Sequence, residues 1–579
     1  MSVHYAPLPP GWPAVSLAEA HHRLTQRGSP FELEDIVING IPQKIWKSGP
    51  KTLAELFRNG RTHGARDFLI HDDERITFEA FTRAALAMAE ALRKRGIAKG
   101  DRVAIVMRNL PEWPVAFFAT VLLGAIATPL NAWWTADEVE FALNDSGAKL
   151  VILDNERYER VKDILGRCES VRHVLVTRLK APIPAGVEAL EELIGNATAW
   201  HLLPDRPLIG AAILPEDPAA ILYTSGTTGR PKGALQTHRN STCNATITPF
   251  VAARAFVRRG EPVPAPDPNV QRSNLISVPF FHTTGCHAIL CPSLNAGVKL
   301  VMMRRWDAER GMQLIERERI TSCGGVPTVA WQIVEHPNRE NYDLSSLEAI
   351  SYGGAPAASE LVKRIKDVFP KSAPGLGWGM TETTAAVATH NGEDYVNRPE
   401  STGPAVPINE LAIVDDDWNR LPAGTIGELI VKGPNVIAGY WNRPEANASL
   451  FRDGWFRTGD LAKLDEEGFL FIVDRKKDML IRGGENIYCI EVEDVLQQHP
   501  AVMDAGLVGL PHKTLGEEPA AVVMLKPGMD VTEDELKAHV RANLAAFKVP
   551  VKIKFLHEPL PRNVNGKILK PALKQLFAV

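Results

Sequence analysis

The stretch from residue 77 to residue 177 alternates between a helical pattern and short, almost entirely apolar segments. Apolar side chains recur at helical spacing after residue 77, in one stripe that ends at Gly96. Segments 101–107, 149–154 and 173–177 are nearly continuous apolar runs, which is typical of strands covered on both faces. Alternation of this kind predicts a parallel, doubly wound α/β sheet.

A second block of the same kind begins near residue 219. Its first strand, 219–223, is expected to lead through a glycine-rich loop into a helix. Further strands are expected at 274–280, 298–303 and 347–356. Residues 400–475 change to short strands and turns, among which "DEEG" is a natural hairpin turn. We therefore expect a large N-terminal domain of two doubly wound sheets with a small β subdomain.

The chain after residue 478 has the pattern of a small α+β unit. Helices are expected near 489–498 and 533–545, with strands at 503–509, 519–525 and 551–556. Because 579 residues exceed what one hydrophobic core can serve, several units are expected. We predict an extended N-terminal arm over residues 1–50, a large domain over 51–474 and a small, mobile C-terminal domain over 475–579. The charged stretch "DRKKD" (474–478) is the candidate joint, and a static surface turn is its alternative interpretation.

Composition narrows the classes to which the chain can belong. Its formal net charge of −4 shows no excess of positive charge of the kind that is typical of nucleic-acid-binding proteins. Six cysteines without paired spacing favour a reducing compartment, and we expect a cytoplasmic location. The N-terminus lacks the pattern of a secretory leader, and the uncharged stretch 114–130 is interpreted as a buried helix running into a strand rather than a transmembrane segment. Peripheral membrane contact and a homo-oligomer are both compatible with this composition.

Residues 222–234, "LYTSGTTGRPKGA", combine glycines with hydroxyl and cationic side chains. Glycines let a backbone approach an anion closely, and the hydroxyl and ammonium groups donate to it. The stretch is not a Walker-type loop, because Pro231 stands five residues after Gly226. Its place directly after an apolar strand favours a phosphate site over a solvated surface loop. The residues expected to take part are Thr224, Ser225, Gly226, Thr227, Thr228, Gly229 and Lys232.

Four further stretches suit the other parts of a nucleotide. "SYGGAP" (351–356) places two glycines after a strand, where a flat base can lie against the backbone. "GWGMTET" (377–383) offers Trp378 for stacking, followed by Thr381 and Glu382. "WFRTGD" ends on Asp460, whose two oxygens can accept both hydroxyls of a ribose. "NVNGKILK" presents Lys567 after a glycine turn.

These motifs together resemble one known group of enzymes. The set "YTSGTTGRPKG", "SYGGAP", "GWGMTET", "WFRTGD", "DRKKD", "RGGENIYCIEVE" and "NGKILK" occurs in this order. It is similar to the acyl-CoA synthetase branch of the adenylate-forming superfamily, which also contains luciferases and non-ribosomal adenylation domains. The resemblance covers about residues 50 to 579.

The resemblance implies how ATP would be held. The loop Thr224–Lys232 would close over its β- and γ-phosphates, and Asp460 would take the ribose hydroxyls with the help of Arg475. Adenine would be framed by Gly354, Ala355, Pro356 and Trp378. Thr381 would contact the α-phosphate and Glu382 would hold Mg²⁺.

The implied reaction is ligation of a carboxylic acid to coenzyme A through an acyl-adenylate, with release of pyrophosphate and AMP. Two anions meet in the first step, so charge neutralisation and alignment carry the catalysis, and Lys567 would bridge the acid and the α-phosphate. Gly483 and Gly484 would line the pantetheine tunnel from the same small domain. Because Lys567 and these glycines cannot serve one site in one pose, the resemblance implies a rotation of the small domain about Lys477.

The segment "PFFHTTGCHAILC" (279–291) has two interpretations. His282, Cys286, His287 and Cys291 are potential metal ligands, but their spacing does not match tetrahedral zinc sites and their setting is apolar. In the resembling family this segment borders the acyl pocket. We therefore expect Phe281, His282 and Gly285, together with Gly353, to form the pocket wall, with a packed core histidine as the alternative for His282.

Three positions depart from the family pattern. Cys489 stands where a proline is usual, Lys570 where arginine is frequent, and Trp378 where tyrosine is more usual. None of these departures removes a charge that the chemistry needs, so we expect activity to survive. For Cys489 a buried, inert thiol is expected rather than a redox-sensitive one.

The sequence restricts the class of the acid substrate but does not identify one acid. Relatives that activate amino acids carry a carboxylate in the pocket segment, and here that segment has none, so an ammonium group would be buried unpaired. Medium- or long-chain fatty acids are expected first, with aryl and arylalkanoic acids close behind. The alternatives are an acyl-AMP ligase or luciferase-like enzyme whose second step does not use coenzyme A, and a non-catalytic nucleotide-binding scaffold.

Overall fold

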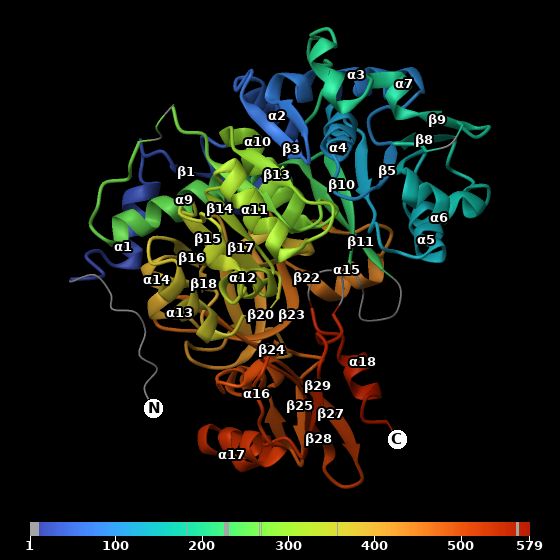
Figure 1. Cartoon of the computed structure of the whole chain (residues 1–579). Coiled ribbons are helices and arrows are strands. Elements are labelled where there is room, and N and C mark those ends of the chain that lie inside the picture. The colour runs from blue at the N-terminus through green and yellow to red at the C-terminus, as the bar shows by residue number, and fades with distance from the viewer. Residues whose placement is uncertain are drawn as a thin grey trace.

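The computed structural model describes residues 11–180, 182–224, 231–265, 267, 269–355, 357–562 and 567–578. Within these ranges the strands form four sheets and one separate hairpin. In Figure 1 the C-terminal part, in red and orange-red, forms a lobe below the rest of the molecule. This is the α/β class with a large N-terminal domain and a smaller C-terminal domain that the sequence predicts.

The first sheet is doubly wound, as predicted. Its strand order is β21 (Gly439–Tyr440), β11 (Lys232–Thr237), β10 (Pro218–Thr224), β6 (Ile126–Pro129), β5 (Arg102–Val106), β7 (Leu150–Asp154), β8 (His173–Thr177) and β9 (Val187–Ala189). From β10 to β9 the neighbours pair in parallel. Helix α3 (Phe78–Lys94) precedes β5, and helices α4 (Glu112–Leu122), α5 (Ala136–Ser146), α6 (Asn155–Leu165) and α7 (Leu190–Ile194) follow β5, β6, β7 and β9.

Strand β5 shows why these strands are almost continuously apolar. Val103 and Ile105 pack in a core with α3 and α4, whereas Ala104 and Val106 pack on the opposite face with α5 and α6. Both faces of the strand are therefore removed from water. The same two-sided burial applies to the segment 114–130, which forms α4 and β6 and is buried throughout. Among the described residues, no helix is long and apolar enough to cross a membrane.

The second sheet is also mostly parallel. Its order is β17 (Ala385–Asn391), β16 (Ala373–Met380), β15 (Ala349–Gly353), β14 (Ser322–Gly325), β12 (Ser273–Ile276), β13 (Lys299–Met302), β3 (Asp67–His71) and β4 (Glu74–Thr77). One face packs on α11 (Ala308–Glu318), α12 (Pro327–Val334) and α13 (Ser359–Val368). On the other face, Leu300 and Met302 join the core that holds α3 and α4, so one core connects the two sheets.

Two predictions about the block after residue 219 are wrong. The glycine-rich stretch does not lead into a helix: β10 is followed by β11, which pairs with it antiparallel, and α8 (His238–Thr242) begins only after that. The block is also not a separate sheet. Strands β10 and β11 extend the first sheet, while β3 and β4, from before residue 78, complete the second. Both differences arise from strand pairing between segments that are far apart in the sequence. The local spacing of apolar residues does not indicate such pairing.

The interpretation of residues 1–50 as an extended arm is wrong for the part that the structure describes. Residues 17–46 form α1 (Leu17–Thr25) and an antiparallel hairpin of β1 (Leu33–Ile38) and β2 (Ile41–Trp46). Trp46 and Phe31 pack around Phe250 of α9 (Asn244–Arg258), with ring centroids 5.3 and 5.5 Å from that of Phe250. This segment is packed onto the large domain. Helix α2 (Leu53–Arg61) follows and joins the main core.

The third sheet is the predicted small β subdomain. Its order is β18 (Gly403–Pro404), β24 (Phe469–Arg475), β23 (Trp455–Leu464), β20 (Gly427–Lys432) and β19 (Glu410–Val414), with β22 (Phe451–Arg452) beside β23. The predicted "DEEG" turn joins β23 to β24, and Gly468 has φ +86° there. The remaining large-domain helices are α10 (Cys291–Ala296), α14 (Glu393–Asn397) and α15 (Pro444–Leu450).

The C-terminal lobe has the predicted α+β elements. Its strands are β25 (Leu480–Arg482), β26 (Glu485–Ile487), β27 (Val502–His512), β28 (Gly516–Leu525) and β29 (Lys552–Leu556). Its helices are α16 (Cys489–Gln497), α17 (Glu533–Asn543) and α18 (Lys570–Gln575). A core of its own, including Leu496, Val523 and Leu536, supports this lobe. The domain boundaries at 50 and 474 stay predictions.

Candidate functional site

Asp460 and Arg475 lie opposite each other on β23 and β24, because the antiparallel register pairs these two positions. The Arg475 Nε is 2.7 Å from Asp460 Oδ1. Trp378, near the end of β16, donates its indole N–H to Asp460 Oδ2 at 3.1 Å. Asp460 is 3% exposed, so this carboxylate is held by a cation on one oxygen and an indole on the other. The structure thus brings together three residues that the sequence singled out from three separate motifs.

Thr381 and Glu382 begin a single 3-10 turn, 381–383, directly after β16. Glu382 is buried, and its Oε1 accepts the hydroxyl of Tyr440 at 2.8 Å. Gln236 Nε2 donates to the Thr381 carbonyl at 3.1 Å. The strand that leads into this turn packs closely against β17. A Cβ at Gly379 would stand 1.8 Å from the Ala385 carbonyl oxygen, so only glycine fits at this position.

Lys232 joins the same group through Tyr440. Its Nζ stands 5.5 Å from the centre of the Tyr440 ring, a cation–π contact, and the Tyr440 hydroxyl in turn donates to Glu382. Thr224 ends β10 with its Oγ1 3.4 Å from the Lys232 carbonyl oxygen. The residues predicted between them, Ser225, Gly226, Thr227, Thr228 and Gly229, lie outside the described residues, as does Pro356.

Lys567 comes from the small C-terminal lobe and reaches this group. Its ammonium is affected by the charges of Arg475, Asp460, Glu382 and Lys477. Burial lowers the pKa of Lys567 to about 8, the Arg475 guanidinium adds to the shift, and the two carboxylates oppose it. A half-buried lysine thus lies within electrostatic reach of the Asp460 and Glu382 carboxylates and of the Arg475 guanidinium.

The glycines of the 351–356 stretch occupy the end of β15. Gly353 pairs with Gly377 of β16, and a Cβ at Gly353 would stand 2.5 Å from the Gly377 carbonyl oxygen. Gly354 has φ +76° and open space where a side chain would be, with the half-buried Ala355 next to it. The backbone beside Trp378 is therefore unobstructed, which suits the approach of a flat ring.

The predicted acyl-pocket residues lie at the end of the second sheet, after β12. Phe281 is buried, 5.2 Å from the Trp133 ring and 4.9 Å from His282 between centroids. Gly285 is buried in a π-helical turn, 284–290, where a Cβ would meet the Pro279 carbonyl oxygen at 2.1 Å, so close backbone packing explains this glycine. Burial lowers the pKa of His287 to about 3, which keeps this fully buried imidazole neutral.

Asn109 holds this segment in place. It follows β5, and its amide donates to the Val278 carbonyl at 2.9 Å while its Oδ1 accepts the Phe280 N–H at the same distance. The end of the first sheet is thereby tied to the pocket segment of the second. Among the described residues, no group of three or more His, Cys, Asp or Glu side chains is arranged to hold a metal ion.

The predicted joint connects β24 of the third sheet to β25 of the C-terminal lobe. Lys477 is exposed in the turn, and Lys476 N–H donates to the Gly459 carbonyl at 2.9 Å. Asp474 is buried and accepts the backbone N–H of Cys489, the first residue of α16. Burial raises the pKa of the Asp474 carboxyl to about 7, although that hydrogen bond opposes the shift.

Gly483 and Gly484 form the exposed turn between β25 and β26, with φ of +60° and +91°. No contact in the described structure brings them to the group around Asp460. Cys489 is buried, as expected, and burial raises the pKa of its thiol. An inert thiol at this position is consistent with that shift.

Sequence reasoning missed Tyr440, Gln236 and Asp474. Tyr440 reaches Glu382 only because β21 pairs with β11, which brings Tyr440 beside Ala234 across some 200 residues of chain. Gln236 lies in β11, which was not expected to be a strand. Asp474 was noted only as part of a charged turn, and its burial depends on the position of α16.

Comparisons with known proteins agree with this geometry. Residues 56–441 match the AMP-binding enzyme family and residues 491–567 match the AMP-binding enzyme C-terminal domain. A feruloyl-CoA synthase from Amycolatopsis is 34% identical over 88% of this chain and 95% of its own length. A long-chain-fatty-acid–CoA ligase from Bacillus subtilis is 34% identical over 86% of this chain and 90% of its own.

A solved structure shows the same fold. The o-succinylbenzoate CoA synthetase of Bacillus subtilis, in complex with its acyl-adenylate intermediate, is 32% identical, with a TM-score of 0.72 over 90% of this chain and 97% of that one. The same enzyme in complex with ATP and a magnesium ion also gives a TM-score of 0.72. The chain therefore belongs to the AMP-binding enzyme family, as an AMP-forming acyl-CoA synthetase of the adenylate-forming superfamily and an acid–thiol ligase.

Proposed function

We propose that this chain ligates an apolar carboxylic acid, fatty or aryl, to coenzyme A at the expense of ATP. In the first step a carboxylate oxygen attacks the α-phosphorus, the bond to the β-phosphate oxygen breaks, and pyrophosphate leaves. In the second step the coenzyme A sulfur attacks the acyl carbon, its proton passes to solvent, and AMP leaves. The proposal rests above all on Lys567, which lies within the electrostatic reach of Glu382, Asp460 and Arg475.

Lys567 is assigned to the first step. An ammonium group beside the reacting carboxylate and the α-phosphate offsets the charge that gathers as the two anions approach. Burial increases the strength of that interaction, because fewer water molecules screen it. Thr381, whose backbone is fixed by Gln236, is assigned to the α-phosphate.

The remaining large-domain residues are assigned to binding. Asp460 takes the ribose hydroxyls, oriented by Arg475 and by the Trp378 indole. Trp378 and the backbone of residues 353–355 frame the adenine. Thr224 and Lys232, at the two ends of the glycine-rich stretch, take the β- and γ-phosphates together with Ser225–Gly229.

Glu382 fits the role of a magnesium ligand. Its carboxylate is buried, and the Tyr440 hydroxyl engages one oxygen only. Mg²⁺ prefers oxygen ligands and commonly binds through one or two carboxylates and substrate phosphates. When bound, the ion would withdraw charge from the phosphates of ATP, and Tyr440 would hold the carboxylate in position for it.

The proposed second step needs a different position of the C-terminal lobe. Lys567 and the glycine turn 483–484 belong to the same lobe. The charges of Asp460 and Glu382 act on Lys567, whereas among the described residues no contact joins the glycine turn to these two carboxylates. We assign Lys477, exposed in the turn between β24 and β25, as the pivot. The observed arrangement then corresponds to the adenylating pose.

The acid is proposed to be apolar because of the pocket segment. Phe281 packs with Trp133, His287 is neutral, and residues 278–291 contain no carboxylate to pair with an ammonium group. Relatives named for feruloyl, long-chain fatty and o-succinylbenzoate substrates span both aryl and alkyl acids.

A panel of acids tests the proposal. Alkanoates of increasing length, cinnamates, benzoates and amino acids are each incubated with ATP, Mg²⁺ and coenzyme A, and AMP and thioester are measured. We expect equal amounts of AMP and thioester with alkyl or aryl acids and neither product with amino acids. Acyl-adenylate that accumulates unchanged in the presence of coenzyme A would instead indicate an acyl-AMP ligase.

A further inference from the structure

Helix α5 carries a negative charge at its unfavourable end. Asp145 lies in the last turn of α5, just before the left-handed C-cap at Gly147. A carboxylate is disfavoured in this turn, because the last carbonyl groups of a helix already carry partial negative charge. The Asp145 side chain is 11% exposed, so water offers it little compensation. Partners from other parts of the chain therefore stabilise this carboxylate.

These partners come from both sides of the glycine-rich stretch. Tyr223, the residue before Thr224, donates its hydroxyl to Asp145 Oδ2 at 2.7 Å. Arg443, which follows β21, donates to Asp145 Oδ1 at 2.6 Å. The indole N–H of Trp441 donates to the Asp145 carbonyl at 3.1 Å, which satisfies one of the carbonyl groups left open at a helix end. One residue of α5 thus holds two segments that are far apart in the sequence.

The two segments support the residues assigned to the phosphates. Tyr223 pairs with Gly233 in the ladder of β10 and β11. The next pair in that ladder is Thr224 with Lys232. The backbone N–H of Trp441 donates to the Gly233 carbonyl at 2.7 Å. Asp145 therefore holds the strand before the glycine-rich stretch through Tyr223 and the strand after it through Trp441.

Trp441 extends this support to the proposed magnesium ligand. The preceding residue, Tyr440, donates its hydroxyl to Glu382, and the centre of its ring lies 5.5 Å from the Lys232 Nζ. Because Tyr440 and Trp441 are consecutive, a shift of Trp441 would carry the Tyr440 ring with it. The contacts of that ring with Glu382 and Lys232 would then change together.

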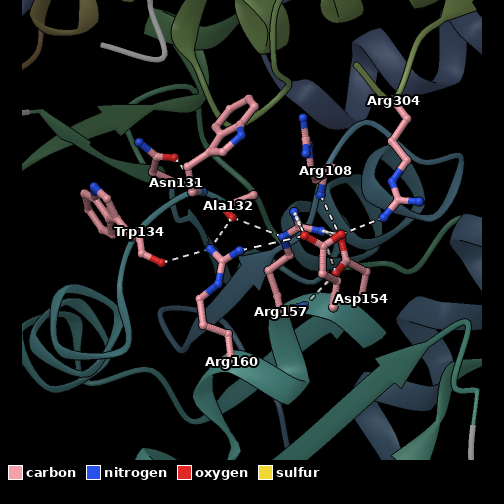
Figure 2. Close-up of polar contacts among 10 residues, drawn as sticks. Arg108, Asn131, Ala132, Trp134, Asp154, Arg157, Arg160 and Arg304 are labelled. Carbon is pink, nitrogen blue, oxygen red and sulfur yellow. Dashed lines mark hydrogen bonds and ion pairs between the residues drawn. The ribbon is translucent and has the colours of Figure 1, made fainter.

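Helix α5 is also fixed at its beginning. Thr135 and Glu138 form a capping box in its first turn. The carbonyl of the preceding Trp134 accepts an N–H from Arg160 of α6 at 3.1 Å (Figure 2). The Trp134 ring meets the Tyr223 ring edge-on, with centroids 6.1 Å apart. Tyr223 is therefore oriented by α5 at its hydroxyl and by the residue before α5 at its ring.

We propose that Asp145 is a positioning residue that fixes Thr224, Lys232 and Tyr440 for the β- and γ-phosphates of ATP and for pyrophosphate. The inference rests on the proposed function, which assigns Thr224 and Lys232 to these phosphates. Asp145 acts through these residues and not by contact with the nucleotide. Donors that are already fixed stabilise charge more strongly, because they need not reorient as the charge develops. AMP lacks the β- and γ-phosphates, so its binding does not depend on Asp145.

Pyrophosphate exchange and its inhibition by AMP separate this role from a general structural one. KM for ATP, KM for pyrophosphate and the inhibition constant of AMP are measured for the wild type, Asp145→Ala and Asp145→Asn. The control is Asn144→Ala, since Asn144 is the exposed neighbour in the same turn. We expect D145A to raise both KM values about tenfold, as for one lost hydrogen bond to a charged group, with AMP inhibition unchanged. D145N keeps an acceptor for the Tyr223 hydroxyl and should show a smaller rise, and N144A should show none.

Two further variants keep the carboxylate and test the same role if D145A does not fold. Tyr223→Phe removes one hydroxyl and Arg443→Ala removes one cation from Asp145. Each should raise both KM values and leave AMP inhibition unchanged. Where D145A folds, adding either substitution to it should raise the KM values no further, because the shared partner is already absent.

Two results would overturn the inference. One is KM values for ATP and pyrophosphate that equal those of the wild type in D145A, or in Y223F and R443A. The other is a rise in the AMP inhibition constant equal to the rise in KM, which would indicate a general loss of the nucleotide site. A wild type that exchanges pyrophosphate with none of the acids in the panel would contradict the proposed function instead, so the two failures are distinguishable.

Discussion

The backbone N–H of Cys489 donates to the carboxylate of Asp474, so a strand of the third sheet caps a helix of the C-terminal lobe. Helix α16 has no side-chain cap of its own, because Tyr488 at its N-cap position cannot accept the first N–H groups. Asp474 precedes the turn that holds Lys477. This bond therefore ties the orientation of the small lobe to the end of the large domain, in the arrangement that also places Lys567 beside Asp460.

Replacing Cys489 by proline tests the hydrogen bond between Cys489 and Asp474, because proline has no N–H to donate. Proline suits the first position of a helix, and Tyr488 already has the extended backbone that precedes a proline, so the variant is expected to fold. We expect adenylation at pH 8, where Asp474 is ionised, to slow by about tenfold, as for the loss of a hydrogen bond to a buried charge. Pyrophosphate exchange measures it. Cys489→Ala keeps the N–H and serves as the control; equal behaviour of the two variants would mean that the bond does not hold the pose.

Asp474 also predicts a dependence of stability on pH. Its carboxyl keeps a proton up to a pKa of about 7 in the folded chain, while the unfolded chain releases it near its ordinary value of about 4. The folded state therefore binds more protons between these values, and its stability falls as pH rises through them. Relative to Asp474→Asn, the wild type should lose thermal stability between pH 5 and pH 8.

The control for this effect is Asp416→Asn. Asp416 is exposed, and its hydrogen bond with Lys476 lowers the pKa of its carboxyl, so its own titration lies below this window. The difference between D416N and the wild type should stay constant from pH 5 to pH 8. A difference between D474N and the wild type that is also constant would show that Asp474 titrates at its ordinary value.

Lys567 predicts an alkaline limit to adenylation. Its ammonium form is the one that offsets phosphate charge, and its pKa of about 8 means that this form is lost as pH rises through that value. We expect kcat/KM for pyrophosphate exchange to fall above about pH 8. The Lys567→Arg variant keeps its positive charge over this range. Its reaction should be slower, but its kcat/KM should not fall above about pH 8. A decrease of kcat/KM at the same pH in both enzymes would mean that another group causes it.

Tyr440→Phe tests the proposed magnesium ligand. The variant loses only the hydroxyl that orients Glu382, and removal of such a supporting group commonly costs tenfold or more in metal affinity. The concentration of Mg²⁺ that gives half-maximal adenylation should therefore rise about tenfold. Tyr395→Phe removes another buried hydroxyl, 2.8 Å from that of Tyr352, and should leave the Mg²⁺ requirement unchanged. Equal Mg²⁺ curves for all three enzymes would contradict the role of Tyr440.

The sequence predicts those parts of the fold that local patterns determine. Strands such as β5 and β7 are buried on both faces, and their continuous apolar runs reveal them. Strand β11, with the pattern "KGALQT", has no such run, and its place depends on pairing with β10 and with β21. The segment 17–46 likewise looked irregular because its order comes from packing on Phe250.

The same division applies to the site. Trp378, Asp460 and Lys567 carry chemistry that a motif displays, and the structure places them together. Tyr440 and Asp474 act by supporting other residues across long distances in sequence. Their hydroxyl and carboxyl groups resemble those of any surface residue until the sheets and α16 bring them to Glu382 and Cys489. Supporting residues are therefore the part that a single sequence does not reveal.

We infer that a lysine of the C-terminal lobe, Lys567, serves the first half-reaction and not the second. Separate measurement of both halves in Lys567→Ala tests it most directly, with pyrophosphate exchange for the first and thioester formation from supplied acyl-adenylate for the second. We predict that exchange falls by about a hundredfold or more, as for the loss of one group that stabilises transition-state charge, while thioester formation stays close to that of the wild type. Equal losses in both half-reactions would show that Lys567 is not specific to adenylation.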